Sequence, residues 1–154
     1  EEGFKTDLVL PVSYKLRYVE ITQRNHQRVT LMRPLLGHDA IHPDIDRTVS
    51  TYYSDIVQEV SEAIGANGVV IVGMRHNPFV KKARKTLQEA GIEFKYLEYG
   101  SYTSQWHKRL SLKMWSGWAT FPMIFVDQTL IGGYNELQAL LKTPDAKLTS
   151  LTRV

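Results

Sequence analysis

The stretch with the clearest chemical potential is the turn at residues 73–80, Gly-Met-Arg-His-Asn-Pro-Phe-Val. It follows an apolar run at residues 69–72, which is short, β-branched and bounded by glycines and therefore predicts a buried strand. Asn77 and Pro78 are typical of a helix N-cap and a first helical residue. A strand that turns into a helix start gathers unpaired N–H groups and positive dipole at one point. Such points bind anions or stabilise thiolates in many proteins.

The residues after this turn predict an amphipathic helix. Apolar side chains recur there at helical spacing, and a glycine stands where the helix should end. The lysines and arginine of the same stretch predict a solvated face, with attraction for an anionic ligand as the alternative. The apolar set is Phe79, Val80, Ala83, Leu87 and Ala90, the basic set is Lys81, Lys82, Arg84 and Lys85, and the glycine is Gly91.

Residues 77–80 resemble the active-site turn of glutaredoxins, which carries Cys-Pro-Tyr-Cys or a single-cysteine variant. Pro78 and Phe79 match that pattern, whereas Asn77 and Val80 stand at the two cysteine positions. The chain contains no cysteine at all. The resemblance, to a family of cell redox homeostasis, therefore implies a glutaredoxin-like fold. The same residues argue against thiol chemistry, and we predict no catalytic residue.

Two later segments extend the resemblance. Residues 118–122, Trp-Ala-Thr-Phe-Pro, are similar to the family's Trp-Pro-Thr-hydrophobic-Pro segment, from which Ala119 departs. The resemblance implies that Pro122 is a cis-proline and that the main chain of Phe121 pairs with a bound glutathione or peptide backbone. Residues 132–135, Gly-Gly-Tyr-Asn, are similar to the family's Gly-Gly-Cys-Asp.

The resemblance also implies where a ligand's charged groups would lie. The main chain at Tyr134 and Asn135 would hold a γ-glutamyl carboxylate at a helix start. Asn135 replaces an aspartate that would hold the ligand's ammonium group. Arg109 stands where the family often has a basic residue for the other carboxylate, and Arg75 stands one place after the position of a usual lysine, which here is Met74. The predicted ligand-binding residues are Arg75, Asn77, Phe79, Arg109, Phe121, Pro122, Gly133, Tyr134 and Asn135.

The sequence predicts a thioredoxin-like, glutaredoxin-like three-layer α/β/α sandwich with a four-stranded mixed sheet. A helix at residues 46–64 precedes the first strand, and a helix opening at Thr103 or Ser104 ends near residue 116. A last helix follows Gly133, with leucines on its apolar face. The first two strands should be parallel and the last two should form an antiparallel hairpin. The expected strands are residues 68–72, 94–99, 123–126 and 129–131.

The chain is expected to divide into an N-terminal extension, residues 1–46, and a glutaredoxin-like domain, residues 47–154. Alternation at residues 14–22 and 27–32 predicts a β-hairpin in the extension. An isolated hairpin is marginally stable in water. It would need the surface of the domain or a second copy of the chain, so a homodimer through the extension is one option.

Composition restricts the class of protein. Of the 154 residues, 43% are hydrophobic, which is enough for a packed core, but no apolar run approaches the roughly 20 residues of a membrane span. The formal net charge is only +3, and no aromatic-basic motif points to nucleic acid. Because no signal-peptide pattern is visible, a cytoplasmic location is the default expectation.

The polar loop at residues 38–46 is a candidate metal site. Histidines and carboxylates this dense can bind a divalent ion. However, Pro43 disfavours the helix that would bring His38 and His42 onto one face. We therefore predict no metal and no cofactor, and expect Asp44 or Asp46 to cap the following helix.

The functional hypothesis is a non-redox module that binds glutathione or an extended peptide segment. One alternative is a glutathione-dependent disulfide oxidoreductase that uses Tyr134, Tyr99 or the thiol of a bound glutathione. Another is a structural or dimerisation scaffold with a vestigial cleft. A thiolate at the helix start is what the redox reaction needs, and neither Asn77 nor Val80 can supply it.

Overall fold

The computed structural model describes residues 36–143. The chain divides into two compact units, residues 1–51 and 52–154. In the first, the described part holds a 3₁₀ helix, His38–Ala40, and helix α1, Pro43–Thr51. The hairpin expected at residues 14–22 and 27–32 lies outside the described residues.

The second unit is built on the predicted four-stranded mixed sheet, in the order β2-β1-β3-β4. β1 pairs in parallel with β2 and antiparallel with β3, and β3 pairs antiparallel with β4. The parallel first pair and the C-terminal hairpin are thus confirmed. The strands are β1 (Val69–Gly73), β2 (Lys95–Glu98), β3 (Met123–Val126) and β4 (Thr129–Gly132).

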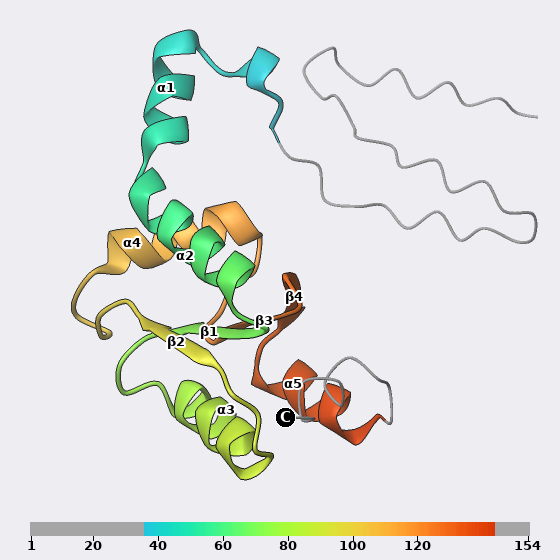
Figure 1. The fold of residues 1–154 in the computed structure, drawn as a ribbon. Coiled ribbons are helices and arrows are strands. Elements are labelled where there is room, and N and C mark those ends of the chain that lie inside the picture. The colour runs from blue at the N-terminus through green and yellow to red at the C-terminus, as the bar shows by residue number, and fades with distance from the viewer. Residues whose placement is uncertain (1–35, 144–154) are drawn as a thin grey trace, which may run out of the picture. The chain divides into compact units, whose positions relative to one another are not determined.

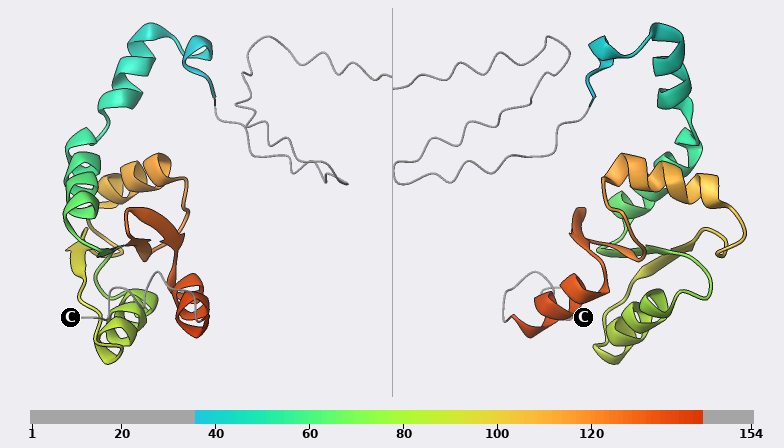
Figure 2. Two further views of the ribbon diagram at one scale, coloured as in Figure 1. Left: turned by 45° about the vertical axis from the view of Figure 1, so that its right-hand side comes forward. Right: turned by 180° about the vertical axis from the view of Figure 1, so that it is seen from behind.

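Helices cover both faces of this sheet, which confirms the three-layer prediction. Figures 1 and 2 show α2 and α4 on one face and α3 and α5 on the other. β1 is buried along its whole length because it has a strand on each side and helices above and below. The helices of this unit are α2 (Ser54–Ala66), α3 (Pro78–Glu89), α4 (Trp106–Ser116) and α5 (Tyr134–Lys142).

The alternation of side chains along β1 divides the core into two apolar clusters. Val70 and Val72 pack on the α2 and α4 side, whereas Val69 and Ile71 pack on the α3 and α5 side. This follows from the two-residue period of a strand. Both clusters contain residues of β3, so the two central strands hold the layers together.

The helix predicted at residues 46–64 is wrong as a single element. It is interrupted at Tyr52 and Tyr53, and Tyr53 has a φ of 47°, in the left-handed region. A residue there cannot continue a right-handed helix. The helical spacing of apolar residues continues across Tyr52 and Tyr53, so the sequence pattern did not indicate the break.

Helix α4 begins at Trp106, two or three residues later than predicted, after Gln105 in the left-handed region. Its buried residues are Arg109, Ser111 and Leu112. The three large apolar side chains expected on its apolar face are substantially exposed: Trp106 is 55% exposed, Leu110 38% and Met114 56%.

The helices are short. The longest described one, α2, has 13 residues, whereas a membrane span needs roughly 20. Within residues 36–143, none has the length and hydrophobicity to cross a membrane.

Candidate ligand-binding groove

A groove of about 460 Å³ opens where the start of α3, the loop before β3 and the start of α5 meet. Most of the predicted site lines it, namely Asn77, Phe79, Phe121, Pro122, Gly133, Tyr134 and Asn135. Met74, Pro78, Tyr102, Lys113, Trp118, Ala119, Thr120 and Glu136 complete the lining.

The start of α3 has no unpaired amide left in its first turn. Oδ1 of Asn77 accepts hydrogen bonds from the amides of Phe79 (2.9 Å) and Val80 (3.1 Å). The Lys81 amide donates to the main-chain oxygen of Asn77, and Pro78 has no N–H to donate. The predicted N-cap is confirmed, and it occupies the donors that a bound anion or thiolate would otherwise use.

Val80, at the second cysteine position, is a core residue. It is only 1% exposed and belongs to the apolar cluster beneath α2 and α4. Gly73 makes room for it, because a Cβ on Gly73 would lie 2.8 Å from Cγ1 of Val80. The second thiol position therefore serves the packing of α3 against β1.

The loop before β3 presents main-chain groups to the groove. The Phe121–Pro122 peptide bond is cis, as predicted. Among the described residues, no hydrogen-bond partner is found for the main-chain N–H and C=O of Phe121. Nε1 of Trp118 is buried and likewise has no acceptor within residues 36–143. This wall can therefore pair with an extended backbone.

The start of α5 is only partly capped. The carboxylate of Glu136 accepts a hydrogen bond from the amide of Gly133, the N-cap residue, at 2.9 Å. For the next two amides, those of Tyr134 and Asn135, no acceptor is found in the described part of the chain. These amides lie at the positive end of the α5 dipole and can donate hydrogen bonds to a carboxylate.

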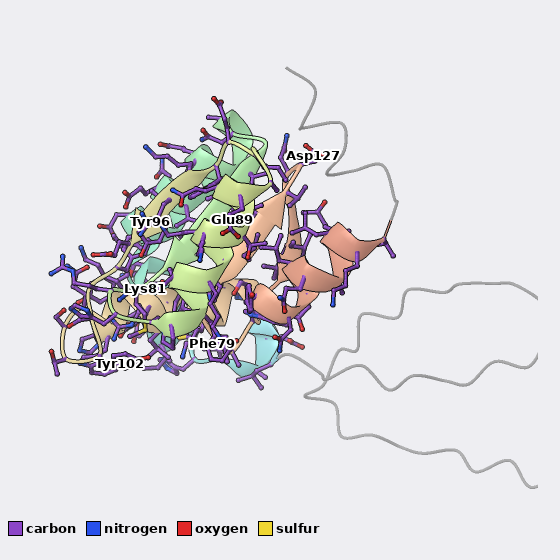
Figure 3. All side chains as sticks on the ribbon, turned by 90° about the horizontal axis from the view of Figure 1, so that it is seen from below. Phe79, Lys81, Glu89, Tyr96, Tyr102 and Asp127 are labelled. Carbon is purple, nitrogen blue, oxygen red and sulfur yellow. The ribbon has the colours of Figure 1, made fainter. Side chains whose placement is uncertain are left out.

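Aromatic rings form the outer wall of the groove. The ring centroids of Phe79 and Tyr134 are 6.4 Å apart. Figure 3 shows Phe79 and Tyr102 near the same end of the domain, whereas Asp127, in the β3–β4 turn, lies at the opposite end. Lys113 adds a positive charge, with Nζ 5.6 Å from the ring centroid of Phe121.

The two arginines predicted to meet a ligand carboxylate do not line the groove. Arg109 is 8% exposed and its guanidinium donates to the main-chain oxygens of Tyr99 (2.8 Å) and Ser104. Burial lowers the pKa of Arg109. Nε of Arg75 lies 3.0 Å from Oε1 of Glu98 on the surface. In the structure Arg109 ties a loop to α4 and Arg75 makes a surface ion pair, both outside the lining of the groove.

Sequence reasoning missed Lys113 and Glu136, the groove's charged residues. Glu136 stands three residues after the N-cap Gly133, which is the spacing of a carboxylate that returns to cap a helix. That signal was available. Lys113 lies four residues after Arg109 on the same face of α4, and sequence spacing could not show that Arg109 would be drawn to loop carbonyls while Lys113 lines the groove.

The polar loop in the first unit makes local contacts. Nδ1 of His38 lies 2.7 Å from Oδ1 of Asp46, and Nδ1 of His42 accepts the amide of Asp44. No group of three or more His, Asp or Glu side chains placed to hold a metal occurs within residues 36–143.

The fold is that of a thioredoxin-like domain. Its sheet joins a parallel strand pair to an antiparallel hairpin, helices cover both faces, and a cis-proline lies in the groove. The glutaredoxin family model matches residues 69–131. A glutaredoxin-like protein from Dictyostelium discoideum is 53% identical over 93 residues, covering 60% of this chain and 76% of the relative. The chain belongs to the glutaredoxin family. Glutaredoxin-C2 from Arabidopsis thaliana is 27% identical over 95 residues, covering 62% of this chain and 84% of that relative.

Solved structures agree with this fold. A buckwheat glutaredoxin–glutathione complex is similar with a TM-score of 0.55 at 18% identity, covering 64% of this chain and 88% of that one. A wheat glutaredoxin has a TM-score of 0.54 at 26% identity, covering 63% and 90% of the two chains.

Proposed function

We propose that this protein binds glutathione or an extended peptide segment in the groove, without thiol–disulfide exchange. One observation carries the proposal. Within residues 36–143, the main-chain groups of Phe121, Tyr134 and Asn135 at the groove have no hydrogen-bond partner, while Asn77 and Val80 occupy the cysteine positions. Main-chain hydrogen bonds need no cysteine, so binding can persist where the redox reaction cannot.

The groove's polar groups suggest how the tripeptide would lie. Its middle residue would pair with the main chain of Phe121, and its γ-glutamyl carboxylate would meet the amides of Tyr134 and Asn135. The carboxylate of Glu136 would attract the ammonium group, and Lys113 would attract the second carboxylate. We expect a dissociation constant on the order of millimolar, about −4 kcal/mol, because most of these contacts are main-chain hydrogen bonds.

The enzymatic alternative has weaker support. Tyr99, one residue considered for it, donates its hydroxyl to Glu59 at 3.0 Å and lies outside the groove lining. Burial, followed by that hydrogen bond, raises the pKa of Tyr99. Raising the pKa makes a phenolate base harder to form. Tyr134 does line the groove but has no thiol partner in this chain.

The test is a chemical-shift titration of the full chain with reduced glutathione. We expect shifts at Asn77, at Phe121 and at residues 133–135. Lys113→Met should weaken binding about threefold to fivefold, as expected for one exposed ion pair. Lys108→Met, on the same helix but outside the groove lining, is the matched control and should bind as the wild type does.

Two outcomes would overturn the proposal. If saturating glutathione and an extended peptide both leave those amides unmoved, the groove is vestigial and the scaffold alternative stands. If a glutathione mixed disulfide is turned over clearly faster than by a heat-killed control, the enzymatic alternative stands.

A further inference from the structure

The side chain of Asn77 has two ends with different surroundings. Its oxygen accepts two amide hydrogen bonds from the first turn of α3. Only the carbonyl oxygen of a carboxamide can accept, so those two donors fix which atom is Oδ1 and which is Nδ2. The NH₂ group is therefore turned away from the helix backbone.

That NH₂ group is the donor that α3 still offers to the groove. Asn77 is 9% exposed and lines the groove, and no acceptor for its Nδ2 is found within residues 36–143. The wholly buried side-chain atoms without a partner in that range are Nε of Arg84 and Nε1 of Trp118. Since Nδ2 of Asn77 is not among them, it remains accessible from the groove.

We propose that Nδ2 of Asn77 donates a hydrogen bond to the sulfur of a bound glutathione, so that the ligand's thiol is held without a covalent bond. This rests on the proposed function. There the main chain of the middle residue pairs with Phe121, and the carboxylates and the ammonium group go to other partners. The thiol side chain is the group of the tripeptide that has not yet been given a partner. Nδ2 of Asn77 is the donor at the start of α3 that has not yet been given an acceptor.

This contact makes binding sensitive to the charge on sulfur. A neutral thiol is a weak acceptor, whereas a thiolate forms a charge-assisted hydrogen bond. Preference for glutathione over its analogue γ-glutamyl-α-aminobutyryl-glycine, in which a methyl group replaces the thiol, should therefore grow with pH. The increase should occur around a thiol's ordinary pKa of about 8.5. The amino group and carboxylates titrate alike in both peptides, so the ratio of their affinities isolates the sulfur.

Asn77→Asp separates the two ends of the side chain. Aspartate caps helices as well as asparagine does, so α3 keeps its start. The NH₂ donor, however, becomes an acceptor oxygen. At pH 7 the added negative charge acts on both peptides equally and cancels in the ratio, whereas at pH 9.5 it also repels a thiolate held beside it. Thr120→Asp adds the same charge at an exposed residue of the groove lining without touching Asn77, and is the matched control.

The experiment measures dissociation constants of both peptides for the full-length wild type and both variants, at pH 7 and 9.5, with a non-thiol reductant present. We expect the wild type and Thr120→Asp to prefer glutathione about threefold at pH 7 and about tenfold at pH 9.5. Asn77→Asp should show no preference at pH 7 and should disfavour glutathione at pH 9.5, where its carboxylate repels the thiolate. If it fails to fold, Asn77→Gly, which removes the NH₂ donor and is tolerated at an N-cap, replaces it.

The outcomes are separable. Equal affinity of the wild type for the two peptides, or an unchanged preference in Asn77→Asp, overturns the role of Asn77 and leaves the proposed function standing. If neither peptide binds the wild type, the proposed function itself has failed.

Discussion

Two helices begin at the groove, and their starts are used in opposite ways. At α3, the Asn77 oxygen accepts the amides of both Phe79 and Val80, and the first turn is closed. At α5, Glu136 accepts the Gly133 amide, while those of Tyr134 and Asn135 have no acceptor in the described part of the chain. The α3 start supports the fold, and the α5 start is open to a ligand.

The difference shows what a residue other than cysteine must supply at such a position. Unpaired amides at a buried helix start are costly, so the residue that precedes them must bring an acceptor. Asparagine brings one on a short side chain, as serine, threonine and aspartate also would. A structural cap has therefore taken over the donors that favour thiolate chemistry.

The largest expected effect concerns Arg109, another predicted ligand residue that serves the fold. Arg109→Met should lower the free energy of unfolding by about 2–4 kcal/mol, because two main-chain oxygens lose a charged donor. Chemical denaturation measures it, with Lys108→Met as the control on the same helix. If the variant is as stable as the wild type but binds glutathione more weakly, Arg109 contacts the ligand instead.

The next effect tests the closed start of α3 directly. Asn77→Ala should lower the free energy of unfolding by about 1–2 kcal/mol, because the amides of Phe79 and Val80 lose their acceptor. Asn77→Asp should be as stable as the wild type near pH 7. Thermal unfolding of the three proteins checks this, and equal stability of the alanine variant would show that the cap is dispensable.

Opening the α3 start should restore a reactive site. In Asn77→Cys, the amides of Phe79 and Val80 become available to a thiolate, so the introduced thiol should have a pKa at least about one unit below 8.5. With no other cysteine in the chain, its ultraviolet absorbance reports this pKa alone. Ala119→Cys, in the same groove but away from a helix start, should titrate near the ordinary value. Matching pKa values in the two variants would contradict the comparison.

The smallest effect sharpens the open start of α5. Asn135→Asp should tighten glutathione binding about threefold at pH 7, because it returns a carboxylate for the ligand's ammonium group. The glutathione titration proposed above measures it. Weaker binding would mean that Glu136 already satisfies the ammonium and that further negative charge repels the ligand.

The fold could be predicted where local and global signals agree. The run at residues 69–72 is apolar on both faces, as a central strand must be, and β3 begins and ends where predicted. Asn77 and Pro78 form a start signal that needs no tertiary information. The break at Tyr52 and Tyr53 could not be predicted in this way, because neither residue is a glycine or proline.

The groove could be predicted where main chain forms it and less well where long side chains do. Phe121, Gly133 and Tyr134 are placed by the strand and helix ends that carry them. Arg109 and Lys113 lie one helical turn apart, and the partners that draw Arg109 inward are carbonyls of a separate loop. Such partners are visible only once the chain has folded.

Because the three tryptophans differ in their surroundings, intrinsic fluorescence can report binding in the groove. Trp118 lines the groove, and its indole N–H has no acceptor in the part of the chain that the structure describes, whereas Trp106 and Trp115 lie outside the lining and are 55% and 42% exposed. Replacing the latter two with phenylalanine would leave emission from Trp118 alone. Binding in the groove could then be followed, without a label, as a shift in the emission maximum of Trp118.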